Sequence, residues 1–152
     1  GSARPLLRDL CNAAGDAAVG ARGGSVERVH TGMWDSAVRL DAKVRANIEA
    51  ALAPGGPCEG MRLLVVGHSL GAGVASLLAI RWRSLGVFPD VECVAFAAPC
   101  IVSGGLGGAV QGYVTSVALA DDAVCRWSLG STKDACHAAA ILGTKRGTME
   151  RL

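Results

Sequence analysis

A G-x-S-x-G pentapeptide between an apolar strand and an apolar helix is the feature that most constrains how this chain folds. The pentapeptide occupies residues 67–71, after the aliphatic run at 61–66 and before the proline-free stretch at 72–83. A serine at such a strand-to-helix turn is held with its Oγ exposed, as a nucleophile requires. The pattern therefore predicts a nucleophile elbow centred on Ser69. The alternative is a glycine-rich turn that carries an ordinary serine.

Glycines stand two residues before and two residues after Ser69, and the strained turn requires such small residues. We expect Gly67 and Gly71 to remove side chains that would collide at the turn. The backbone N–H of Leu70, the residue after the nucleophile, is the expected donor to an oxyanion. One such donor makes a partial oxyanion hole.

Composition predicts one globular domain that covers residues 1–152. Hydrophobic residues make up 51% of the chain and charged residues 18%, which is enough to bury a substantial core. The net charge is only +2, the basic residues are scattered, and aromatic residues make up 4%. These values disfavour a nucleic-acid partner, because neither a basic patch nor a stacking platform is indicated.

The six cysteines include no C-x-x-C pair. This spacing favours buried free thiols in a reducing intracellular compartment over a disulfide scaffold or a zinc site, and no metal or cofactor is predicted. Two apolar stretches, 63–80 and 93–120, have the length of a membrane span. Both are interrupted by turn residues, so we interpret them as the interior of an α/β domain and predict no transmembrane segment.

Periodicity and turn signals predict alternating helices and strands. Helices are expected at 4–14, 33–52, 72–83, near Ala109, and from a cap at 131–134 to about Leu142. Extended segments are expected at 26–29, 61–66, 91–97 and 114–120, and loops at 15–25 and over the glycine run at 104–108. Strands separated by crossover segments imply a mainly parallel sheet with right-handed connections and flanking helices.

Acidic residues follow the third predicted strand, in the position where an α/β sheet gathers its reactive groups. Ser69 follows the strand at 61–66, and Asp121 and Asp122 follow the strand at 114–120. The carboxyl ends of parallel strands meet at one edge of a sheet, so these groups are expected near one another. A carboxylate is needed there to orient and stabilise a catalytic histidine. A solvated turn is the alternative interpretation of the two acids.

None of the three histidines is a convincing catalytic base. His68 lies inside the elbow and is expected to pack, and His30 is expected to make a structural hydrogen bond. His137 follows the acids as the order Ser, Asp, His requires, but it falls in a predicted helix only fifteen residues after Asp122. The base is therefore expected to be absent from this segment.

Four motifs, in order, resemble those of fungal-type (class 3) lipases, with the closest likeness to sn-1-specific diacylglycerol lipases. They lie at residues 30–33 (His-Thr-Gly-Met), 67–73 (Gly-His-Ser-Leu-Gly-Ala-Gly), 93–99 (Cys-Val-Ala-Phe-Ala-Ala-Pro) and 117–126 (Val-Ala-Leu-Ala-Asp-Asp-Ala-Val-Cys-Arg). The resemblance implies an α/β-hydrolase-like fold and an acylglycerol or other lipid ester substrate. It also implies that Asp122, directly before an apolar pair, is the catalytic acid.

The chain departs from the family pattern at three places. Cys125 stands where the family has a proline after the apolar pair. The R-G-T segment with the second oxyanion donor is expected upstream of Gly1, and the catalytic histidine downstream of Leu152. We therefore expect the central segment of a lipase domain, with a sheet incomplete at both ends.

Two functional hypotheses follow from the sequence. The first is a serine ester hydrolase of the triacylglycerol/diacylglycerol lipase type, with Ser69 as nucleophile and Asp122 as acid. The second is a non-catalytic lipase-like domain that acts as a structural or assembly subunit. The segment is expected either to aggregate or to rely on another polypeptide that covers its exposed sheet edges. Membrane association of the complete protein is left open, since neither an apolar lid nor an anchor is visible in this segment.

Overall fold

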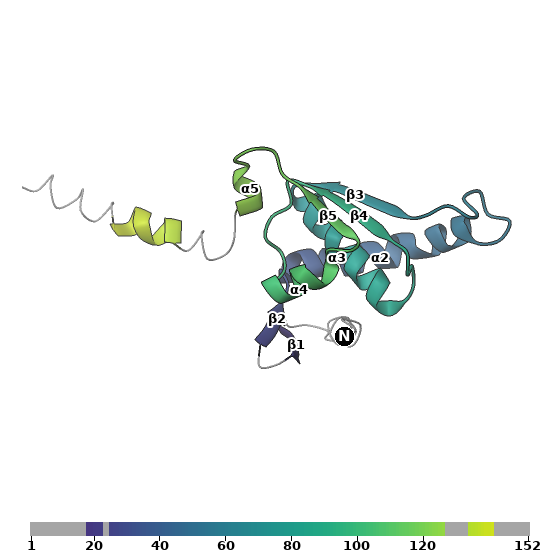
Figure 1. Cartoon of the computed structure of the whole chain (residues 1–152), viewed down its shortest axis with the longest axis horizontal. Coiled ribbons are helices and arrows are strands. Elements are labelled where there is room, and N and C mark those ends of the chain that lie inside the picture. The colour runs from purple at the N-terminus through teal and green to yellow at the C-terminus, as the bar shows by residue number, and fades with distance from the viewer. Residues whose placement is uncertain (1–17, 23–24, 127–133, 142–152) are drawn as a thin grey trace, which may run out of the picture.

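The computed structural model describes residues 18–22, 25–126 and 134–141. Within them a three-stranded parallel sheet has the order β3-β4-β5. Its strands are β3 (Leu64–His68), β4 (Glu92–Phe96) and β5 (Val114–Val117). The main helices, α2 (Thr31–Leu52), α3 (Leu70–Leu85) and α4 (Gly104–Val110), lie on the same side of this sheet (Figure 1). The predicted α/β arrangement with parallel strands is confirmed.

The three strands occur where the sequence predicts them, with shifted ends. The register places Val65 beside Cys93, and Cys93 beside Val114. β3 begins three residues after the predicted start, because the chain first turns at residues 56–61, where the Met61 N–H donates to the Cys58 carbonyl. β5 ends at Val117 rather than Ala120. Ala120 has a φ of 47°, which an extended strand cannot accommodate.

Local capping sets the ends of α2 and α3. The Nδ1 of His30 accepts a hydrogen bond from the Met33 N–H at 3.4 Å and thereby caps the first turn of α2. α3 ends at Gly86, whose φ of 70° is left-handed and whose N–H donates back to carbonyl groups of the last turn. The predicted stop at Gly86 is confirmed.

Two predicted loops are in fact regular structure. The segment predicted as a loop at 15–25 contains β1 (Ala18–Arg22), which pairs with β2 (Ser25–Arg28) as an antiparallel hairpin. The glycine run at 104–108 forms most of α4, because Leu106 and Val110, one turn apart, are both buried. Strand pairing in the hairpin, and burial of these two side chains in α4, outweigh the weak local preference of the sequence for strand or helix.

The other differences lie toward the C-terminus. A short helix that the sequence did not indicate, α5 (Ala123–Arg126), follows β5. Residues 134–141 are helical within the range predicted for the final helix. The predicted helix at 4–14 and the cap at 131–133 lie outside the described residues.

The core lies between the helices and the inner face of the sheet. Trp82 of α3 is fully buried and contacts Phe88 edge to face, with ring centroids 4.9 Å apart. The first turns of α2 and α3 also meet closely. A Cβ added at Gly73 would lie 2.6 Å from the Met33 Sδ, so the two helices pack here through a glycine.

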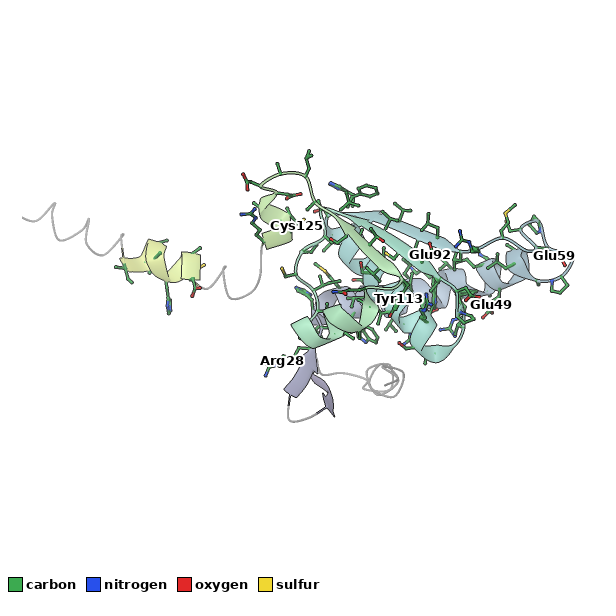
Figure 2. The ribbon with its side chains drawn as sticks, in the orientation of Figure 1. Arg28, Glu49, Glu59, Glu92, Tyr113 and Cys125 are labelled. Atoms are coloured by element: carbon green, nitrogen blue, oxygen red, sulfur yellow. The ribbon has the colours of Figure 1, made fainter. Side chains whose placement is uncertain are left out.

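The outer face of the sheet is apolar and exposed in the part of the chain that the structure describes. Side chains alternate along β3, and those on the outer face include Leu64 and Val66, which are 53% and 57% exposed. The register continues this face onto Phe96 and Val117, which are about 40% exposed. In Figure 2 side chains stand on this face of the sheet, on the side opposite the helices. Exposed apolar patches of this kind mark surfaces that another structure covers.

None of the described helices is both long and apolar enough to span a membrane. The described cysteines are free thiols, but only Cys93 is fully buried. The expectation of buried thiols is therefore wrong for the exposed Cys100 and Cys136, and for Cys58 and Cys125, which are half-buried. Cys11 lies outside the described residues.

Candidate active site

Backbone strain gathers where the three parallel strands end. Among the described residues, the non-glycine positions with positive φ are Ser69 (53°), Ala97 (51°) and Ala120 (47°). They follow β3, β4 and β5 respectively, and these strand ends converge at the edge of the sheet from which the chain continues to α5 (Figure 1). Such conformations persist at sites that the surrounding structure holds in place. The strain therefore points to this edge as the candidate site.

Ser69 is held by its backbone at the junction of β3 and α3. Its φ and ψ are 53° and −123°, and its N–H donates to the Phe96 carbonyl at 2.9 Å. Its own carbonyl accepts from Ala72 and Gly73 at 3.0 and 3.2 Å. The hydroxyl group makes no capping hydrogen bond to α3. The backbone of Ser69 is thus anchored on both sides, and its hydroxyl group does not cap α3.

The two elbow glycines have different roles. A Cβ at Gly67 would lie 2.4 Å from the Gly71 carbonyl oxygen and 2.7 Å from the Ala72 nitrogen, so only glycine fits there. The expectation that Gly71 avoids a similar collision is wrong, because a Cβ at Gly71 meets nothing within 4 Å. The first turn of α3 passes against Gly67, whereas position 71 faces open space.

Leu70 is the first residue of α3, a helix of 16 residues. The first N–H groups of a helix lack intrahelical acceptors and carry the positive end of the helix dipole. The Leu70 N–H therefore belongs to the group that can bind a negative oxygen beside Ser69. Its side chain is 63% exposed at the same edge of the sheet.

The two acids after β5 have different surroundings. The half-buried Asp122 accepts a hydrogen bond on Oδ1 from the Val124 N–H at 2.9 Å, and its own N–H donates to the Leu119 carbonyl. Asp121 is exposed and pairs with Arg126 at 2.9 Å. The turn thus fixes the Asp122 carboxylate directly, whereas Asp121 lies at the surface as a solvated turn would place it.

The histidines are distributed over three parts of the molecule. The structural hydrogen bond expected of His30 is confirmed by its cap on α2. The packing role expected of His68 is wrong: its side chain is exposed, because it shares the uncovered outer face with its register partner Phe96. His137 is exposed on the helix at 134–141, and within the described ranges no hydrogen bond joins it to Ser69 or Asp122.

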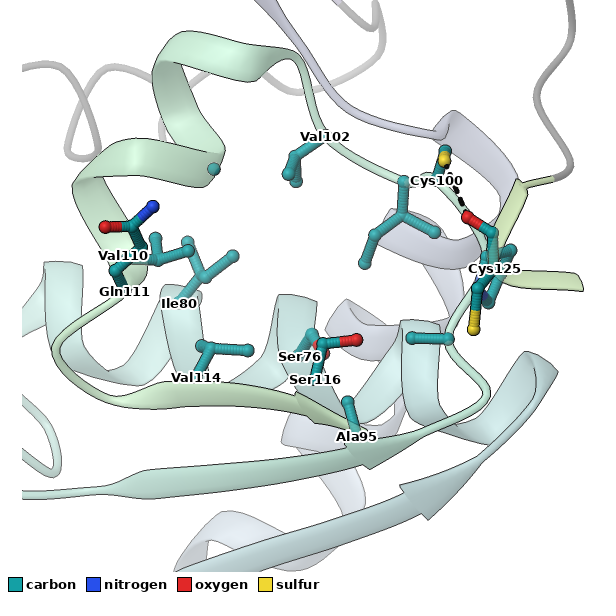
Figure 3. Close-up of a pocket in the computed structure, with 14 residues that line it drawn as sticks. Ser76, Ile80, Ala95, Cys100, Val102, Val110, Gln111, Val114, Ser116 and Cys125 are labelled. Atoms are coloured by element: carbon teal, nitrogen blue, oxygen red, sulfur yellow. Dashed lines mark hydrogen bonds between the residues drawn. The ribbon is translucent and has the colours of Figure 1, made fainter. Parts of the chain in front are cut away.

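Behind the strand ends lies a largely apolar cavity of about 460 Å³. Figure 3 shows it between α3, α4, β5 and the connection after β4, with Ile80, Val110 and Val114 around it.

At one end of the cavity the Cys100 Sγ–H donates to the Cys125 carbonyl at 3.2 Å. Desolvation raises the pKa of the Cys125 thiol, and Asp122 and Cys100 raise it further. The contact between the two cysteines was not predicted from the sequence, because they are twenty-five residues apart and no local motif connects them.

No cluster of three potential metal ligands occurs among the residues that the structure describes.

The family model that matches the chain is Lipase (class 3), over residues 6–131. The chain belongs to the class 3 lipase family. A mouse relative, diacylglycerol lipase-beta, is 40% identical over 74 residues, which are 48% of this chain and 11% of that protein. The chain thus spans a small part of this relative.

Solved lipase structures share the fold of this class 3 lipase chain. A mutant form of MDLA from Penicillium cyclopium is 25% identical, with a TM-score of 0.59 over 83% of this chain and 46% of that one. A triacylglycerol lipase whose catalytic centre is described as a serine protease triad is 18% identical, with a TM-score of 0.61 over 87% and 50%. The lipase from Rhizomucor miehei, solved with its propeptide, is 18% identical, with a TM-score of 0.58 over 87% and 43%. The chain spans about half the length of these structures.

Proposed function

We propose that this chain supplies the nucleophile and the acid of a lipid ester hydrolase of the triacylglycerol/diacylglycerol lipase type. The observation that carries the proposal is the strained backbone of Ser69, held between the Phe96 carbonyl and the first turn of α3. An ordinary serine at a turn has no need of this conformation, whereas a nucleophile elbow depends on it. Membership of the class 3 lipase family supports the same chemistry.

In the proposed reaction the Ser69 Oγ attacks the acyl carbon while its proton passes to a histidine base. The tetrahedral intermediate then collapses, the alcohol leaves with that proton, and an acyl-enzyme remains. Water hydrolyses the acyl-enzyme and releases the fatty acid. The Leu70 N–H, at the positive end of α3, is the proposed donor to the oxyanion.

Asp122 is the proposed acid. Its Oδ1 is fixed by the Val124 N–H at 2.9 Å, so the carboxylate has a defined direction before a histidine binds it. No described histidine is hydrogen-bonded to Asp122 or Ser69, so we assign the base to a histidine outside the described part of the protein. The related triacylglycerol lipase, whose centre is a serine protease triad, supports this division of roles.

The alternative function, a non-catalytic lipase-like subunit, is favoured by one observation. The outer face of the sheet, with Leu64, Val66 and Phe96, is exposed and apolar in the described residues. A face of this composition fits a covering polypeptide. The two functions differ in what they require of Ser69, since an assembly subunit does not need a reactive hydroxyl group.

Labelling with a fluorophosphonate tests the proposal, because this reagent reacts only with an activated serine. In the complete protein we expect the label on Ser69, and we expect Ser69→Ala to abolish both labelling and ester hydrolysis. Ser36→Ala is the matched control, because the Ser36 Oγ donates to the Gly32 carbonyl at 2.8 Å within α2 and does not lie on the turn between β3 and α3. Label retained in Ser69→Ala would contradict the assignment. A folded wild-type protein that takes no label would favour the assembly subunit.

A further inference from the structure

Cys100 and Cys125 form a pair of thiols beside the loop that carries Asp122. Cys100 follows Pro99 in the connection after β4, and Cys125 lies on α5. The Cys100 Sγ–H donates to the Cys125 carbonyl at 3.2 Å, as the dashed line in Figure 3 marks. Both thiols are free; Cys100 is exposed and Cys125 is half-buried. The two side chains are therefore neighbours in space without a covalent bond.

We propose that Cys100 and Cys125 are an oxidative modification site, at which a hydroperoxide converts the two thiols into one intramolecular disulfide. The Cys100 thiol loses its proton to solvent and the thiolate attacks one peroxide oxygen; the O–O bond breaks, a sulfenic acid remains on Cys100, and the leaving hydroxide takes up a proton as one water. The Cys125 thiolate then attacks that sulfur, the S–O bond breaks, and a second water leaves. In sum, two thiols and one hydrogen peroxide give one disulfide and two waters.

The surroundings of each thiol set the order of the two steps. Cys100 is exposed, so a peroxide reaches it from solvent. Cys125 is half-buried and therefore less accessible from solvent than Cys100, so it reacts second; desolvation, and further Asp122 and Cys100, also raise the pKa of its thiol. Cys93 is excluded by burial, and its pKa is also raised by desolvation.

The disulfide would act on Asp122 through α5. In the reduced form, Cys100 contacts the backbone carbonyl of Cys125 rather than its sulfur. Forming the S–S bond requires the Cys125 sulfur to approach the Cys100 sulfur, and we expect the four-residue helix α5 to shift with it. The Val124 N–H that holds the Asp122 Oδ1 belongs to the same helix. Oxidation is therefore expected to lower hydrolysis, and this consequence alone rests on the proposed function.

Peptide mapping tests the modification independently of activity. The folded protein is treated with hydrogen peroxide, alkylated to block remaining thiols, and digested before aspartate. Cleavage then separates residues 90–120, which contain Cys100, from residues 122–133, which contain Cys125. We expect these two peptides joined, with the loss of two hydrogens, and separated again by a thiol reductant.

Variants identify the sulfurs. Cys100→Ser and Cys125→Ser are each expected to reduce the joined peptide by at least about tenfold, because the partner thiol is lost from its high local concentration. Cys58→Ser and Cys136→Ser are matched controls that should leave its yield unchanged. A joined peptide that persists in Cys100→Ser would assign the bond to Cys93 and overturn the proposal. The proposal is also overturned if wild-type protein gives no joined peptide, or mainly cross-links to Cys136.

A second measurement separates this inference from the proposed hydrolase. Hydrogen exchange over residues 119–126 is expected to change on oxidation in the wild type and not in Cys100→Ser, whether or not the protein hydrolyses esters. Unchanged exchange in a protein shown to carry the disulfide would overturn the link to the acid loop. If the disulfide and the exchange change both appear but Ser69 takes no label, the proposed hydrolase fails while the modification site stands.

Discussion

The buried carboxylate of Asp41 on α2 accepts a hydrogen bond from the indole N–H of Trp82 on α3, with 2.7 Å between Oδ1 and Nε1. Two arginines complete the cluster. Arg45 donates to both carboxylate oxygens, and the Arg81 Nε donates to Oδ2 at 3.0 Å. Asp41 is only 3% exposed, so its charge is stable there only because these donors surround it. The cluster joins α2 to the helix that begins at the elbow.

We therefore expect Asp41→Asn to destabilise the protein by about 3 kcal/mol, since it removes one partner of a buried ion pair and leaves the arginine charges uncompensated. Urea unfolding followed by circular dichroism measures the loss. Asp35→Asn is the matched control, because Asp35 lies on the same helix and is exposed; it should change the free energy of unfolding by about 0.5 kcal/mol or less. Equal losses in both variants would contradict the role of the cluster.

The same carboxylate predicts how stability depends on pH. Burial alone would raise the pKa of Asp41, but hydrogen bonds from Arg45, Trp82 and Arg81 together lower it from 3.8 to about 2. The unfolded chain therefore binds this proton more tightly than the folded protein does. The stabilisation, about 2 kcal/mol, is complete above the unfolded pKa and is lost as the pH falls through the folded pKa.

Urea unfolding between pH 5 and about pH 2 measures this loss. Asp41→Asn has no carboxyl group at position 41, so its stability should fall less steeply over this interval than that of the wild type. Parallel pH profiles for the two proteins would show that other carboxylates cause the acid sensitivity.

The two glycines of the G-x-S-x-G pentapeptide are expected to differ in how well they tolerate alanine, because only Gly67 is surrounded by close backbone atoms. Gly67→Ala places a Cβ 2.4 Å from the Gly71 carbonyl oxygen, and we expect the Gly71–Ala72 backbone to yield only by displacing the turn at Ser69. We expect this variant to lose about 1–3 kcal/mol of stability and to lose fluorophosphonate labelling. A Cβ at position 71 has no atom within 4 Å, so Gly71→Ala should be tolerated and should change the free energy of unfolding by about 1 kcal/mol or less. If Gly71→Ala were as damaging as Gly67→Ala, a bound partner at the elbow would be indicated.

The strained strand-to-helix turn at Ser69 was predictable from sequence, because the chemistry proposed for it requires particular residues at adjacent positions. The three core strands were predictable because both faces of β3 and β4 are apolar over short runs. β2 overlaps the extended segment predicted at 26–29, but β1 and its pairing with β2 were not predicted, since glycine and alanine carry little strand preference and the pairing itself stabilises the hairpin. The Asp41–Trp82 bond and the Cys100–Cys125 contact join residues distant in sequence, and only the packed fold brings them together.

The neighbouring acids after β5 allow a matched comparison within the proposed site. Asp122 is half-buried and fixed by the Val124 N–H, whereas Asp121 is exposed and paired with Arg126 at the surface. Asp122→Asn is expected to reduce kcat of the complete enzyme by about 10⁴-fold, because an amide cannot hold a catalytic histidine in the required tautomer. Asp121→Asn removes only a surface ion pair, which contributes about 1 kcal/mol or less to stability, and should leave kcat nearly unchanged. Steady-state hydrolysis of an acylglycerol, with fluorophosphonate labelling of Ser69 as a check on the elbow, measures the difference. If the larger loss followed Asp121→Asn instead, the acid would have to be reassigned to Asp121.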